Sequence, residues 1–134
     1  MSEENVEIMR RSYAAFNRGD IEEIVADVAP DFEYFPPAGV IPGVMGVYRG
    51  PEGFRQWSGA FWGEFDDAHI EVHEFVDAGD QVLASLTLRG RGKQSGAESS
   101  WTAWELWTVR DGKLVHGQAM TSRDEALEAA GLSE

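Results

Sequence analysis

The chain has 134 residues, 43% of them hydrophobic and 26% charged, which predicts one globular domain spanning residues 1–134. Its formal net charge of −13 argues against binding to nucleic acid or to an anionic membrane, because both repel an acidic protein. There is no cysteine, no apolar run of about 18 residues and no basic leader before the acidic start MSEE. We therefore expect a cytoplasmic protein without disulfides or a spanning helix.

The first third of the chain predicts two helices and a strand. Residues 3–17 carry apolar side chains at helical spacing. Asp20 and Glu23 form a capping box for a short second helix, which we expect to end before Pro30. Residues 31–35 alternate weakly and indicate a strand. Residues 36–50 are rich in proline and glycine and predict a long apolar loop.

A third helix is predicted to begin at Pro51, because proline fits the first helical turn. Its apolar face is aromatic and comprises Phe54, Trp57, Phe61, Trp62 and Phe65. This face predicts a helix that packs its aromatic side into the core.

From residue 68 onward the hydrophobic period changes to two, which is typical of strands. Residues 70–76 and 81–88 predict one hairpin, and residues 101–109 and 114–120 predict a second around Asp111-Gly112. Residues 89–99 indicate a flexible loop or a frayed continuation of the strand. A short last helix begins after Ser122. Helices collected before strands predict an α+β fold, with three helices on the concave face of a curved antiparallel sheet.

Several short motifs resemble the nuclear transport factor 2-like superfamily. They are FNRGD at residues 16–20, PDFEY at 30–34, YRG at 48–50 and WTVRDGKL at 107–114. Within that superfamily the chain is most similar to the small bacterial SnoaL-like and ketosteroid isomerase-like proteins. The resemblance implies a cone-shaped fold around one small-molecule pocket, no cofactor, and several different activities.

The polar groups of ketosteroid isomerase are not found at the positions that the resemblance aligns with them. Its two tyrosine positions fall on Ser12 and Ser58, its base on Pro36, and its oxyanion-hole aspartic acid on Trp104. Because that mechanism needs a base and a donor pair at fixed points, the resemblance does not imply steroid isomerisation.

The last hairpin allows its faces to be assigned from the sequence. A two-residue turn at Asp111-Gly112 pairs Trp107 with His116 and Glu105 with Gln118. Strand alternation then places one set of side chains inside the cone, where small residues leave room for a ligand unless Trp104 fills the space. The predicted pocket lining is Tyr13, Tyr34, Trp57, Phe61, Trp104, Leu106, Gly117 and Ala119.

The opposite face of this hairpin is predicted to form a homodimer interface, since its aromatic and methionine side chains are typical of interfaces. Its residues are Trp101, Glu105, Trp107, His116, Gln118 and Met120. Glu105 is the one charged residue between 101 and 109. If buried it would serve as an acid or base, but the predicted register turns it away from the pocket, towards Gln118 or His116.

Candidate catalytic residues are sparse. His69, Glu71 and His73 share a strand face, but the two histidines are about 13 Å apart on a straight strand, so we expect no metal site. His73 remains a candidate general base, and Tyr34 and Tyr48 are candidate proton donors.

Two functions follow from these observations. The first is a cofactor-free isomerase, cyclase or dehydratase acting on a small apolar carbonyl compound. The second is a non-catalytic ligand-binding or dimerisation module.

Overall fold

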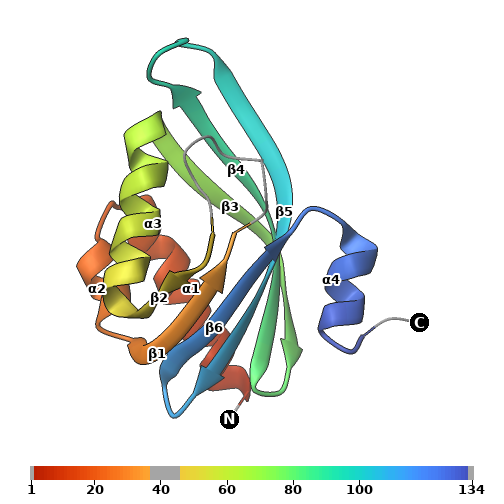
Figure 1. The fold of residues 1–134 in the computed structure, drawn as a ribbon. Helices are drawn as coiled ribbons and strands as arrows, with labels where there is room; N and C mark the ends of the chain where they lie inside the picture. The colour runs from red at the N-terminus through yellow and green to blue at the C-terminus, as the bar shows by residue number, and fades with distance from the viewer. Residues whose placement is uncertain (1, 37–45, 133–134) are drawn as a thin grey trace.

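The computed structural model describes residues 2–36 and 46–132 (Figure 1). In chain order the elements are α1 (Ser2–Asn17), α2 (Ile21–Val25), β1 (Val28–Phe35), β2 (Tyr48–Arg49), α3 (Gly50–Glu64), β3 (Phe65–Ala78), β4 (Gln81–Gly92), β5 (Glu98–Arg110), β6 (Lys113–Met120) and α4 (Arg123–Ala129).

The strands form one curved sheet in the order β2-β1-β6-β5-β4-β3. Helices α1, α2 and α3 lie on one face of this sheet and α4 lies on the other (Figure 1). The α+β class and the placement of the helices in the N-terminal half are confirmed. The sheet is mixed rather than wholly antiparallel, because β1 pairs in parallel with β6.

The predicted helices are found, with changes at their ends. Asp20 accepts a hydrogen bond from the Glu23 amide and caps α2, which ends at Val25, well before Pro30. The first strand therefore starts earlier than predicted, at Val28. It includes Pro30 because the pairing with β6 is interrupted between Val28 and Glu33, so the missing proline N–H breaks no observed ladder pair.

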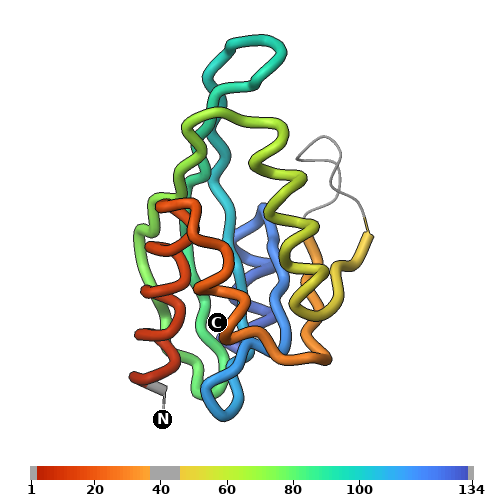
Figure 2. Tube along the Cα trace, turned by 90° about the vertical axis from the view of Figure 1, so that its left-hand side faces the viewer, coloured from red at the N-terminus to blue at the C-terminus, as the bar shows by residue number. Residues whose placement is uncertain are grey.

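Of the two alternatives for residues 89–99, the strand continuation is found over most of the segment. β4 continues to Gly92 and β5 begins at Glu98, and the two strands stay paired as far as Arg91 and Glu98. This hairpin projects beyond α3 (Figure 2). Most of the other predicted loop, residues 37–45, lies outside the described residues, while β2 forms at its end.

The β5–β6 hairpin contains a β-bulge that the sequence pattern does not predict. Val109 lies opposite Leu114, as a two-residue turn requires, but Thr108 lies opposite His116. Val115 is thus the extra residue of a β-bulge, and every later pair is shifted by one position. The predicted pairs are wrong beyond this point, since Trp107 lies opposite Gly117 and Glu105 opposite Ala119.

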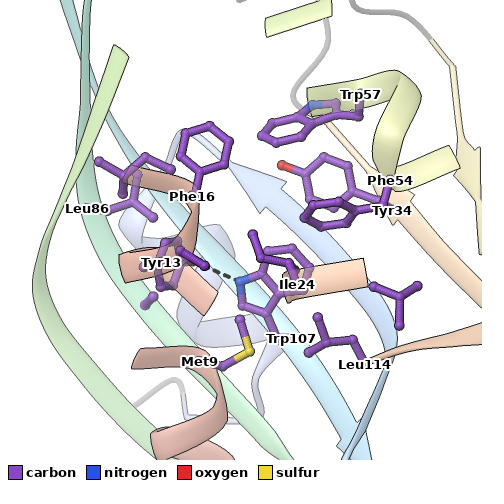
Figure 3. Close-up of a cluster of buried hydrophobic side chains, with 14 of the residues drawn as sticks. Met9, Tyr13, Phe16, Ile24, Tyr34, Phe54, Trp57, Leu86, Trp107 and Leu114 are labelled. Carbon is purple, nitrogen blue, oxygen red and sulfur yellow. Dashed lines mark hydrogen bonds between the residues drawn. The ribbon is translucent and has the colours of Figure 1, made fainter. Parts of the chain in front are cut away.

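Two hydrophobic clusters pack against the two faces of the sheet. The larger one lies between the sheet and α1–α3 and includes Phe16, Phe32, Trp57, Phe61 and Trp107 (Figure 3). The smaller one lies beneath α4 and joins Leu83, Leu106 and Met120 to Ala126. Among the described residues, no helix has the length and apolar character needed to cross a membrane.

Candidate functional site

A buried carboxyl group lies at the centre of the larger cluster. Glu105 is 4% exposed and accepts hydrogen bonds from the hydroxyls of Tyr13, at 2.5 Å, and Tyr34, at 2.8 Å. The indole Nε1 of Trp107 donates to the Tyr13 hydroxyl at 2.8 Å (Figure 3). Four side chains from α1, β1 and β5 thus form one continuous hydrogen-bonded network.

Local structure explains why these side chains meet. Tyr13 belongs to the apolar stripe by which α1 packs on the sheet, and Tyr34 is an inward residue of β1. Glu105 and Trp107 are two positions apart on β5, so both point to the same face. The tyrosine rings bury their apolar bodies in the core and direct their hydroxyls at the carboxyl group.

Burial controls the electrostatics of this network. Desolvation raises the pKa of Glu105 above its usual value, while hydrogen bonds from Tyr13, Tyr34 and Trp107 partly oppose the rise in that pKa. Desolvation, followed by the neighbouring Glu105 charge, raises the pKa of each tyrosine well above its ordinary range. Both phenols therefore stay protonated and act as donors, and Glu105 is the group able to exchange a proton.

A small cavity borders the network. Its volume is about 30 Å³, which is enough for one or two water molecules. The cavity lies between α1, α2, α3 and the inner face of the sheet. Its lining residues are Met9, Ser12, Tyr13, Phe16, Ile24, Phe54, Trp57, Ile70, Glu105, Trp107 and Leu114. The interior of the cone is thus nearly filled, mostly by aromatic side chains.

Gly117 packs directly against the rings of Trp107 and Tyr34. A Cβ atom at this position would lie 2.4 Å from Cζ3 of Trp107 and 2.9 Å from Cδ1 of Tyr34. The two rings stack on each other with centroids 5.5 Å apart and planes inclined by 17°. Only glycine leaves the space for this stack, which in turn directs Tyr34 and Trp107 to their hydrogen bonds.

The predicted pocket residues divide between the two faces. Three of them, Tyr13, Tyr34 and Trp57, lie around the network, and Phe61 stacks behind Trp57. Gly117 and Ala119 also face inward. In contrast, Trp104 and Leu106 lie on the opposite face against α4, and their predicted inward placement is wrong. The bulge at Val115 explains the error, because it reverses the facing of β5 relative to β6.

The residues predicted for the dimer face are affected by the same reversal. Glu105 and Trp107 are buried inside the monomer, and Trp101 packs edge-on against Phe65 in the inner cluster. Met120 is buried beneath α4. His116 and Gln118 do lie on the outer face, where both are half-buried. Glu105, Trp107 and Met120 cannot serve as exposed anchors because the monomer already buries them, whereas Trp101 stays half-buried.

The other candidate residues lie away from the network. His73 is on the outer side of β3, where its Nε2 lies 2.7 Å from the hydroxyl of Thr87. Tyr48 is half-buried on the edge strand β2 and does not line the cavity. Glu71 bonds to Arg89 at 3.0 Å, and His69 is exposed. Within residues 2–36 and 46–132, no three acidic or histidine side chains gather as metal ligands.

The sequence contained one signal for the network. Glu105 is the sole charge in an otherwise uncharged strand between residues 101 and 109. The aligned isomerase positions, Ser12 and Trp104, lie one residue before Tyr13 and Glu105. Tyr13 and Glu105 are the side chains that meet inside the fold. The chain therefore has a tyrosine and a carboxyl group one position after the aligned isomerase positions.

The model of the SnoaL-like domain matches residues 9–117, which carry the second half of α1, the sheet up to the middle of β6 and the whole network. The chain belongs to the SnoaL-like domain family. No curated protein sequence matches it. Its place in this family agrees with the arrangement of helices over a curved sheet.

Solved structures agree with this assignment. An NTF2-like protein from Burkholderia thailandensis is 28% identical, with a TM-score of 0.77, and the match covers 93% of this chain and 95% of that one. TerC, co-crystallised with polyporic acid, is 26% identical, with a TM-score of 0.78 and coverage of 95% and 98%. A putative SnoaL-like polyketide cyclase from Jannaschia is 17% identical, with a TM-score of 0.77 and coverage of 99% and 94%. This last likeness shows the fold alone.

Proposed function

We propose that this SnoaL-like protein is a cofactor-free enzyme in which Glu105 transfers a proton to or from a small apolar carbonyl compound. The reaction would belong to the isomerase, cyclase or dehydratase class. One observation carries the proposal: a single carboxyl group, 4% exposed, borders an interior cavity whose other walls are almost entirely apolar. Such a carboxyl group is a candidate acid or base with a stated physical reason.

The network suits Glu105 to proton transfer. Its raised pKa makes the ionised form a stronger base than an exposed glutamate, which favours general acid–base catalysis. Tyr13 and Tyr34 hold one carboxyl oxygen each, so they are positioning residues for Glu105. A carboxylate accepts about four hydrogen bonds, so lone pairs remain for the cavity. As a base, Glu105 would take a proton from the carbon next to a carbonyl. The C–H electron pair would form a C=C bond while the C=O π pair moves to the oxygen, which gives an enolate and a protonated Glu105.

The comparisons support a small organic ligand. TerC, which is 26% identical, was crystallised with polyporic acid. The cavity of about 30 Å³ implies that a larger ligand enters by displacing lining side chains. Met9 is suited to such a displacement, because methionine is unbranched and flexible.

A second candidate function is a non-catalytic ligand-binding or dimerisation module. The nearly filled interior favours it, since little space remains beside Glu105. The outer face also retains Phe35 and His116, whose rings lie 5.2 Å apart and are both half-buried. A homodimer formed through this part of β1 and β6 is the corresponding proposal.

Hydrogen exchange at carbon separates the two functions. The protein would be incubated in D₂O with acetone or cyclopentanone, and the loss of the proton signal beside the carbonyl would be followed by NMR. We expect Glu105→Gln to slow exchange by about 10²- to 10⁴-fold relative to the wild type. Equal rates for wild type, Glu105→Gln and buffer would overturn the enzymatic proposal and favour the binding module.

A further inference from the structure

Three buried polar atoms of α3 have no hydrogen-bond partner. They are Trp57 Nε1, Ser58 Oγ and Trp62 Nε1, and together they are all such side-chain atoms among the described residues. Buried polar groups in native proteins almost always have a partner, because an unpaired donor has lost its bonds to water without replacing them. Their concentration on one helix points to a partner that binds beside it.

Trp57 is the one of these three residues that lines the cavity shared with Glu105. Its indole is held by neighbouring rings on several sides. It meets Tyr34 edge-on at 5.0 Å and stacks on Phe61 at 5.9 Å with planes inclined by 10°. Figure 3 shows the indole beside Tyr34 and Phe54, with no hydrogen bond drawn to its nitrogen. Nε1 is therefore a fixed donor without an acceptor.

The other hydroxyl hydrogens on the cavity wall are already committed. Tyr13 donates its hydrogen to Glu105, and Ser12 donates to the carbonyl oxygen of Ile8 at 2.9 Å. Trp107 Nε1 is bonded to the hydroxyl of Tyr13. Among the side chains that line the cavity, only Trp57 has an N–H group without a hydrogen-bond partner. An acceptor atom on a ligand would satisfy this donor.

We propose that Trp57 Nε1 donates a hydrogen bond to the carbonyl oxygen of the ligand, so that the interior selects neutral apolar compounds that carry such an oxygen. This inference rests on the proposed function, because it takes the cavity beside Glu105 as the binding site. The inference extends the proposed function by assigning a position to each end of the ligand. The oxygen lies at α3, and the carbon that exchanges a proton lies at Glu105. A donor fixed before binding needs little reorganisation and adds specificity as well as affinity.

The test compares two probes of the same shape, acetone and 2-methylpropene, in which a CH₂ group replaces the oxygen. Binding would be followed by the ¹⁵N–¹H signals of the indole groups. We expect acetone to shift the Trp57 signal. Trp57→Phe, which keeps an aromatic wall, should weaken acetone binding roughly two- to tenfold and leave 2-methylpropene binding unchanged.

Trp62→Phe is the matched control, because Trp62 Nε1 is also buried and unpaired but does not line the cavity. It should leave acetone binding unchanged. Equal losses for both probes, an equal loss in Trp62→Phe, or no binding of acetone to the wild type would each overturn the inference. The thermal unfolding midpoint of each variant would confirm that it is folded at the temperature of the titration.

Glu105→Gln separates this inference from the proposed function. The variant keeps a side chain of the same shape, so acetone should still bind and still shift the Trp57 signal while proton exchange is lost. If the wild type shows no exchange but acetone binding depends on Trp57, the proposed enzymatic role fails and the ligand assignment stands.

Discussion

Tyr13 and Glu105 are 92 positions apart in the chain, yet an O–O hydrogen bond of 2.5 Å joins them inside the fold. This bond ties the first helix to the centre of β5. It is charge-assisted when Glu105 is ionised, and such bonds are shorter and stronger than neutral ones. The side chain that aligns α1 on the sheet is therefore also a ligand of the candidate acid–base group.

The stability of the protein should depend on pH through Glu105. Because burial raises the pKa of Glu105 in the folded state above the usual 4.5, ionisation costs more in the folded chain than in the unfolded one. The stabilising contribution of the protonated group is complete below pH 4.5 and is lost as pH rises through the raised pKa. Urea unfolding of wild type and Glu105→Gln across this range measures the effect.

The raised pKa of Glu105 determines the direction in which the free energy of unfolding changes with pH. The free energy of unfolding of the wild type should fall relative to Glu105→Gln as pH rises, by at most about 1.4 kcal/mol per pH unit for one proton. A difference between the two proteins that stays constant from pH 4 to pH 9 would contradict a raised pKa.

The two tyrosines should differ in their contributions. Tyr13→Phe removes a donor to Glu105 and also leaves Trp107 Nε1 without its acceptor, whereas Tyr34→Phe removes one bond. We expect Tyr34→Phe to lower the free energy of unfolding by about 1–3 kcal/mol and Tyr13→Phe to lower it more. Both changes should raise the pKa of Glu105 further, which ¹³C NMR of its carboxyl carbon would detect. The reverse order of the two free energies would argue against this network.

Gly117→Ala should destabilise the protein through crowding. The added methyl group would meet both Trp107 and Tyr34, and overpacking of this kind costs about 1–3 kcal/mol. A smaller residue at position 107 should relieve part of this cost. The double variant Gly117→Ala with Trp107→Leu is therefore expected to show a favourable coupling energy in a double-mutant cycle. Additive losses in that cycle would show that the two sites are independent.

The outer cluster can be tested apart from the interior site. Leu106→Ala removes a buried side chain beneath α4 and should cost about 2–5 kcal/mol in the free energy of unfolding. The matched change Val47→Ala, at an exposed position, should cost little. Because Leu106 faces away from the network, the pKa of Glu105 should be the same in Leu106→Ala as in the wild type. A shifted pKa would show that the two faces are coupled.

The sequence predicted those parts of the fold that local chemistry determines. The cap at Asp20, the proline at the start of α3 and the cap at Ser122 all act over three or four residues, and all are found in the structure. The alternation of the last two strands and the turn at Asp111-Gly112 were also readable.

Long-range features could not be predicted in the same way. The parallel pairing of β1 with β6 depends on residues more than eighty positions apart. The continuation of β4 through Gly92 depends on partners from both β3 and β5. The bulge at Val115 could not be predicted, because neither Val115 nor its two chain neighbours is a glycine or a proline. One undetected residue was enough to move Glu105 from a predicted outer face to the centre of the site.

The same bulge limits how the protein can change in length. Deleting Val115 would remove the extra residue and leave a plain hairpin in which Thr108 still lies opposite His116 and Trp107 opposite Gly117. His116 and Gln118 would stay on the outer face, whereas deleting a residue beyond the bulge, such as Gly117, would turn Gln118 inward against Trp107. Insertions or deletions of a single residue beyond the bulge should therefore be far more damaging than the loss of Val115, and relatives that retain the network should be able to lack this one residue.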